Sequence, residues 1–148
     1  MGWEDIKTYE IMTKQEFEKY LIDIGGLNRT YREYKGPIIE AGWFHIQEGW
    51  YEIVTNIIDE LLSLGWNKRI AQVKEKFGGL RFYVETDDIP EGGWDVIDKY
   101  EKKSRSICEK CGGEGVLRSG KWLRTLCDEH SEGNPPFDSE KYNNLFGS

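Results

Sequence analysis

Apolar residues recur at spacings of three and four along several stretches of the chain, and this spacing predicts amphipathic helices. The first helix is expected over residues 13–24, where Thr13 and Glu16 have the spacing of a capping box and two glycines follow the last apolar position. A longer apolar stripe predicts the central core helix over residues 50–64. A third helix, with a mostly charged outer face, is expected over residues 94–106.

Residues 70–85 have the pattern of a β-hairpin, in which Gly78-Gly79 is expected to form the two-residue turn. One face of this hairpin is apolar except for Glu75, and the other face is rich in basic residues. The predicted cross-strand pairs are Phe77 with Leu80, Glu75 with Phe82, Val73 with Val84, Lys76 with Arg81, Lys74 with Tyr83 and Gln72 with Glu85.

Two of these pairs place charges where they are unfavourable. A carboxylate on the apolar face costs free energy, so Glu75 is expected to find a cationic or amide partner or to have a raised pKa. Lys76 opposite Arg81 brings like charges together, which calls for a carboxylate of the protein or an external phosphate or carboxylate between them. An external ligand would find a stacking surface in Tyr83. The pattern fits both sources of negative charge.

A motif of metal-binding residue types follows the third helix. The spacing C-x2-C-x15-C-x2-H delivers four tetrahedral ligands from a knuckle and a facing turn: Cys108, Cys111, Cys127 and His130. Three cysteines fit a set of disulfides poorly and, in a reducing compartment, favour metal ligation. Because protein side chains fill all four positions, the motif predicts a structural Zn²⁺ rather than a catalytic one.

These elements predict an α+β fold in which helices pack on a short antiparallel sheet, followed by a zinc ribbon or treble-clef-like unit. The α+β domain is expected over residues 1–106 and the zinc-binding unit, with a hairpin between its ligand pairs, over residues 107–132. Residues 133–148 are expected to form a C-terminal tail. Within the first domain, residues 27–42 have the composition of a loop with a short strand at Ile38-Ile39.

Length and charge limit the function classes. A chain of 148 residues with 38% hydrophobic residues fits one compact domain with a small appendage. The net charge of −7 disfavours indiscriminate binding of the whole molecule to DNA, although residues 99–126 carry eight basic and three acidic residues. No stretch reaches the roughly 18 apolar residues of a membrane span, and the start lacks the pattern of a signal peptide, so we expect a cytoplasmic protein.

The sequence offers little support for an enzyme. His45 is the one histidine outside the predicted ligand set, and neither a phosphate-binding glycine loop nor a dinucleotide-binding G-x-G-x-x-G motif occurs. A catalytic role would need Glu75 or Glu40 as a general base in a pocket between the hairpin and the helices.

Three segments carry a resemblance to known proteins. They are Gly49-Trp50 at the start of a helix, the string QVKEKFGGLRFY at residues 72–83, and Cys-x-x-Cys-Gly with a closing Trp-Leu-Arg-Thr-Leu-Cys127. Over residues 42–130 the chain resembles a group of small bacterial and phage proteins with a zinc-ribbon end. The resemblance implies zinc ligation by the four residues of the motif and a setting in the cytoplasm of a bacterial host cell, and it implies no reaction. His130 stands where a fourth cysteine is at least as common.

The sequence therefore favours a non-catalytic, zinc-stabilised binding protein. One such protein is a phage factor that captures a host protein or a small anionic, nucleotide-type signal ligand and so antagonises a host defence. Arg and Lys bind phosphates and aromatic faces bind bases, so the candidate ligand-binding residues are Lys74, Lys76, Arg81, Tyr83, Trp122 and Arg124. The alternative is a nucleic-acid-binding zinc ribbon with phosphates on Lys110, Arg118, Lys121 and Arg124. No membrane partner is expected.

Overall fold

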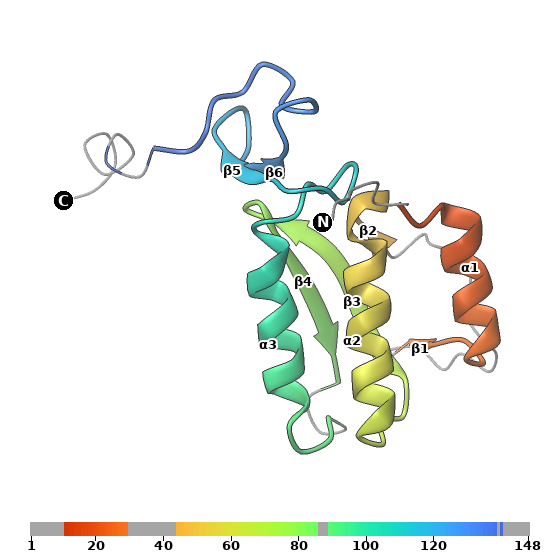
Figure 1. Ribbon diagram of the computed structural model, residues 1–148. Helices are drawn as coiled ribbons and strands as arrows, with labels where there is room; N and C mark the ends of the chain where they lie inside the picture. The colour runs from red at the N-terminus through yellow and green to blue at the C-terminus, as the bar shows by residue number, and fades with distance from the viewer. Residues whose placement is uncertain (1–10, 30–43, 86–88, 139, 141–148) are drawn as a thin grey trace, which may run out of the picture.

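The computed structural model describes residues 11–29, 44–85, 89–138 and 140, with helices gathered beside a small sheet (Figure 1). The elements in chain order are α1 (Lys14–Asp23), β1 (Asn28–Arg29), β2 (Phe44–His45), a 3₁₀ turn (Glu48–Trp50), α2 (Tyr51–Ser63), β3 (Arg69–Lys76), β4 (Gly79–Val84), α3 (Gly93–Ser104), β5 (Val116–Arg118) and β6 (Arg124–Leu126). The predicted α+β class is confirmed. None of the described helices has the length and apolar character needed to cross a membrane.

The helices begin and end where the sequence predicts, to within a few residues. At the start of α1 the Thr13 hydroxyl accepts the Glu16 N–H at 3.1 Å, and the Glu16 carboxylate accepts the Thr13 N–H at 2.8 Å. This reciprocal pair is the capping box. After α2 the chain passes through Gly65, whose φ of 97° lies in the left-handed region that glycine adopts without strain.

Strand β3 is the centre of a mixed sheet. β4 pairs antiparallel with one edge of β3, whereas β1 and β2 pair parallel with the other edge, at Arg69–Ile70 and Val73–Lys74. The sequence predicted only the antiparallel hairpin, because two-residue strands are too short to show alternation. Parallel strands need a crossover connection, which α2 provides between β2 and β3. The predicted strand at Ile38-Ile39 lies outside the described residues.

The hairpin turn lies one residue earlier than predicted. Lys76 pairs with Gly79, so Phe77-Gly78 forms the two-residue turn and the prediction of Gly78-Gly79 is wrong. Both turn residues have left-handed φ angles, 53° and 82°, as a type I′ turn requires. The error moves each cross-strand partner by two positions, so the strand residues keep their predicted faces. Phe77, predicted on the apolar face, is instead 65% exposed in the turn.

The protein itself satisfies both of the unfavourable charges predicted in the hairpin. Glu75 has an amide partner, because its Oε2 accepts the Gly78 N–H at 2.6 Å. Arg81 lies opposite Lys74, where the predicted register put Lys76. The Arg81 Nη1 lies 3.8 Å from Oε1 of Glu101 on α3, so a carboxylate of the protein offsets this charge.

Helix α3 covers the outer edge of β4 and satisfies its backbone. The Leu80 N–H donates to Ser104 Oγ at 2.9 Å, and the Phe82 N–H donates to Glu101 Oε2 at 2.8 Å. The Ser104 hydroxyl in turn donates to the Glu101 carbonyl oxygen at 2.5 Å. Free N–H groups on an edge strand can pair with another chain. Two side chains of one helix close this edge.

The core lies between the helices and the inner face of the sheet. Phe17 of α1 stacks on Tyr51 of α2 with ring centroids 4.5 Å apart and meets Phe44 of β2 edge-on at 5.1 Å, which ties α1 to both elements. The largest fully buried side chains are Trp50, Phe17, Phe82, Leu21, Leu27, Ile57, Ile58, Leu61, Ile70, Leu80, Leu126 and Val54.

The edge contact of α3 gives a first testable prediction. We expect Ser104→Ala to lower the free energy of unfolding by about 1–3 kcal/mol, because the Leu80 N–H then lacks its acceptor in a buried position. Urea denaturation measures the change. Ser106→Ala is the matched control, since Ser106 is exposed and its hydroxyl donates only to the Lys103 carbonyl among the described residues. Its effect should stay within about 0.5 kcal/mol. Equal losses in the two variants would contradict the edge-capping role.

Candidate metal centre

Two tight turns shape the C-terminal unit. In the first, which we call the knuckle (residues 108–113), the Cys108 N–H donates to the Gly113 carbonyl at 2.7 Å and the Gly112 N–H donates to the Cys108 carbonyl at 2.8 Å. Gly112 has a left-handed φ of 81°, which explains a glycine directly after the second cysteine. In the second turn the His130 N–H donates to the Cys127 carbonyl at 3.2 Å. The predicted antiparallel hairpin, β5 and β6, lies between the two turns.

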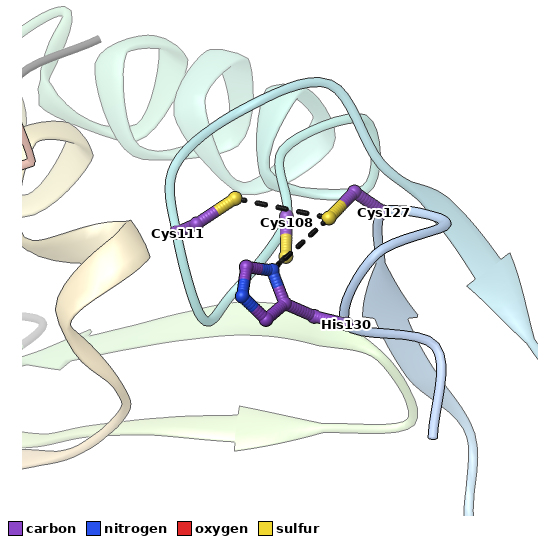
Figure 2. A group of neighbouring side chains, drawn as sticks. All are labelled: Cys108, Cys111, Cys127 and His130. Atoms are coloured by element: carbon purple, nitrogen blue, oxygen red, sulfur yellow. Dashed lines mark hydrogen bonds between the residues drawn. The ribbon is translucent and has the colours of Figure 1, made fainter. Parts of the chain in front are cut away.

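The two turns bring the four predicted ligands together, with their side chains pointing toward one another (Figure 2). The Sγ atoms of Cys111 and Cys127 are 3.8 Å apart, and His130 Nδ1 lies 3.1 Å from Cys127 Sγ and 3.9 Å from Cys108 Sγ. A tetrahedral ion with Zn–S of about 2.3 Å and Zn–N of about 2.0 Å places its ligand atoms about 3.5–3.8 Å apart. Among the described residues this is the one cluster of such side chains close enough to hold a metal ion.

The surroundings of the two knuckle cysteines shift their pKa values in opposite directions. Burial raises the pKa of Cys111 to about 11, and the neighbouring sulfur of Cys108 adds to the effect. Burial also acts to raise the pKa of Cys108, but backbone N–H groups of Cys127, Cys111 and Lys110 outweigh it and lower that pKa below its ordinary value. Amides directed at a sulfur favour the thiolate, which is the form that ligates a metal.

The knuckle docks on the start of α2. The Gly49 N–H donates to the Glu109 carbonyl at 2.7 Å, and the Trp50 indole Nε1 donates to the Ile107 carbonyl at 2.9 Å. A Cβ atom on Gly49 would lie 2.3 Å from the Cys108 carbonyl oxygen, so only glycine fits here. The cluster is therefore anchored directly to the core of the α+β part of the chain.

A buried ion pair closes the same junction. The side chains of Glu109 and Arg124 are only 4% and 17% exposed, and Arg124 Nε donates to Glu109 Oε1 at 3.2 Å. Burial raises the pKa of Glu109, while Arg124 and the backbone N–H of Gln47 act in the opposite direction. The Thr125 hydroxyl donates to the Gly78 carbonyl at 2.6 Å and links β6 to the turn of the β3–β4 hairpin.

Arg118, a predicted phosphate ligand in the alternative hypothesis, is part of the interior of the C-terminal unit. Its side chain is 5% exposed. Its guanidinium donates to the carbonyls of Leu126 at 2.9 Å and Asn134 at 3.0 Å, and to Asp128 Oδ1 at 2.6 Å. Residues 135–137 of the predicted tail hydrogen-bond along β5 and its end, so the start of the tail packs on the hairpin.

The six candidate ligand-binding residues lie in two places. Four share the face of the β3–β4 hairpin opposite the buried one, which we call the exposed sheet face: Lys74, Lys76, Arg81 and Tyr83. All of these except Lys74 also line a hollow of about 540 Å³ between β4 and α3. The other two, Trp122 and Arg124, line a hollow of about 280 Å³ at the junction together with His45 and Glu75.

Sequence reasoning missed several residues of these sites. Trp94 and Asp95 line the larger hollow, and the one available signal was a large aromatic residue in the first turn of a charged helix. The partnership of Glu109 with Arg124 joins the knuckle to β6 and has no signature in the spacing of either residue. Of the two general bases considered for an enzyme, Glu75 binds the hairpin turn and Glu40 lies outside the described residues.

Comparisons of the chain with protein-family models, with curated proteins and with solved structures found no match. The resemblance over residues 42–130 therefore rests on those residues alone. The function has to follow from the contacts, burial and charges of the described side chains.

The cluster predicts the metal content of a variant. We expect the full chain to bind one Zn²⁺ and Cys111→Ala to lose it, because three ligands leave the tetrahedron incomplete. Native mass spectrometry after dialysis against a weak chelator measures the ion. The matched control is Glu129→Ala, since Glu129 is an exposed acidic residue between Cys127 and His130 that lies outside the cluster. A Cys111→Ala chain that keeps the ion, or a Glu129→Ala chain that loses it, would show that the ligand set is wrong.

Proposed function

We propose that the Cys3His cluster holds a structural Zn²⁺ and that the protein is a non-catalytic binding protein for a small anionic, nucleotide-type ligand. Four protein ligands fill the tetrahedral positions and leave none for water or substrate. The unit around them is too small to bury a core of its own, which is the usual setting of a structural metal. Zinc would then stabilise the molecule while the ligand binds elsewhere.

A row of basic side chains across the sheet carries the proposal. In the register of the strands His45 lies beside Lys74, and Lys74 lies beside Arg81. Lys76 follows two positions along β3 and therefore shares the same face. Lys74 and Lys76 repel one another on this face, and the carboxylate of Glu101 lies beside Arg81 rather than beside them, so a bound anion would stabilise the two lysines.

The charges of Lys74 and Lys76 are available to such an anion. No carboxylate of the described residues forms an ion pair with either ammonium group. The Lys74 Nζ lies 5.9 Å from the ring centroid of Tyr83, which is 38% exposed. Free cations beside an exposed aromatic ring suit a ligand that joins phosphates to a planar base.

The basic residues of the C-terminal segment are less available. Within residues 99–126 five of them pair with carboxylates: Lys99 with Glu60, Lys102 with Asp98, Lys110 with Glu132, Arg118 with Asp128 and Arg124 with Glu109. Positive charge that is already offset adds little to the attraction of a nucleic-acid backbone. This contrast favours the exposed sheet face over the nucleic-acid-binding zinc ribbon.

The proposal includes a setting in a bacterial host cell, as a bacterial or phage protein. Its support is residues 72–83, which carry the resemblance to that group of proteins. The same residues supply Lys74, Lys76, Arg81 and Tyr83. The segment that defines the resemblance thus also builds the exposed sheet face.

Charge reversal on the exposed sheet face tests the proposal. We expect Lys74→Glu/Lys76→Glu to weaken binding of ATP and of tripolyphosphate at least about tenfold, because attraction of the phosphates becomes repulsion. Isothermal titration calorimetry on the full zinc-loaded chain measures both affinities. Low ionic strength gives the largest effect, since salt screens exposed charges.

The matched control for this experiment is Lys14→Glu/Lys103→Glu. It changes the net charge equally at exposed positions on α1 and α3, and both affinities should stay as in the unmodified chain. A control that loses as much affinity as the test variant would assign the effect to overall charge. Binding of neither probe by the unmodified protein would contradict the proposed function.

A further inference from the structure

The hollow between β4 and α3 adjoins the exposed sheet face. Its volume of about 540 Å³ lies within the range of about 300–1,000 Å³ that is typical of small-molecule sites. From the hairpin it is lined by Lys76, Arg81 and Tyr83, and from the first turns of α3 by Trp94, Asp95 and Asp98. The hollow therefore joins three residues of the proposed anion site to a wall of α3 that the proposed function does not use.

Two exposed aromatic side chains line this hollow from its two walls. Tyr83 on β4 is 38% exposed and Trp94 on α3 is 48% exposed. Neither ring stacks on another aromatic ring of the described residues. Packing in the core thus does not account for Trp94, whereas aromatic faces of this kind stack on nucleobases of any sequence.

The three carboxylates of α3 that line the hollow differ in whether they already have a partner within the protein. Asp98 pairs with Lys102 at 3.1 Å. Glu101 accepts a backbone N–H of β4, lies near Arg81, and has its pKa raised by burial. The Asp95 carboxylate is exposed and makes no hydrogen bond or ion pair with any described residue. Asp95 is therefore the acceptor that remains for the N–H groups of a base or the hydroxyls of a ribose.

We infer that this hollow takes the nucleoside part of a nucleotide, with the base against Tyr83 and Trp94, Asp95 at its polar edge and the phosphates on Lys76, which has no carboxylate partner among the described residues. The inference rests on the proposed function and adds to it a preference for nucleotides over phosphate chains without a base. The cations attract any phosphate, whereas the aromatic walls and Asp95 separate a nucleotide from a phosphate chain without a base.

Calorimetry on the full zinc-loaded chain tests this with ATP, GTP, CTP, UTP and tripolyphosphate, which lacks a base. At least one nucleotide should bind about tenfold or more tightly than tripolyphosphate, the effect expected of one base stacked on an aromatic side chain. Trp94→Ala should remove most of this preference without changing the affinity for tripolyphosphate, and Trp94→Phe should retain it. The matched control is Ile22→Ala on α1, where a large apolar side chain that is 53% exposed lies outside this hollow. It should keep both affinities.

The outcomes distinguish a failure of base binding in the hollow from a failure of anion binding on the exposed sheet face. Equal affinity for tripolyphosphate and all four nucleotides, or an unchanged preference in Trp94→Ala, would overturn base binding and leave anion binding in place. Binding of none of the five probes would overturn the proposed function itself.

Asp95→Asn should change which nucleotide binds best, because the amide adds N–H donors to the acceptor oxygen. An unchanged order of affinities would remove Asp95 from the site.

Discussion

At Gly49 two stretches of backbone approach so closely that a Cβ atom would lie 2.3 Å from the carbonyl oxygen of Cys108. The Gly49 N–H and the Trp50 indole N–H donate to the carbonyls of Glu109 and Ile107, while the Trp50 ring is fully buried in the core. The Gly49-Trp50 dipeptide thus contacts the knuckle and also contributes a buried side chain to the core. Because the shape of the knuckle depends on its cysteines, metal binding and the order of this junction should be coupled.

The knuckle follows closely after the end of α3. Ser104, the last residue of that helix, lies only four residues before Cys108, and its hydroxyl satisfies the edge of β4. The first turn of the same helix supplies one wall of the hollow beside the exposed sheet face. The Cys3His cluster, the closed sheet edge and the proposed ligand site therefore all adjoin α3, and a binding site needs support of this kind to keep its geometry.

Features that depend on near neighbours in the sequence could be predicted, and features that depend on distant partners could not. The capping box of α1 and the four residues of the Cys3His cluster follow from local spacing. The hairpin turn was misplaced by one residue because Phe77 adopts a left-handed backbone that glycine normally occupies. Hydrogen bonds from Thr125 and to Glu75 hold that turn, and the former comes from far along the chain. Likewise, the residues near Arg118 in the sequence do not predict that its side chain is buried.

Hydrogen exchange measured by mass spectrometry, on the full chain with zinc and after its removal, tests most directly whether the metal organises the C-terminal unit and its junction with α2. Removal of zinc should speed exchange over residues 105–138 and at Gly49, whose N–H donates to the Glu109 carbonyl of the knuckle, while the later turns of α2 and strand β3 keep their protection. Equal protection of residues 105–138 in both forms would contradict a structural metal and the coupling that it implies.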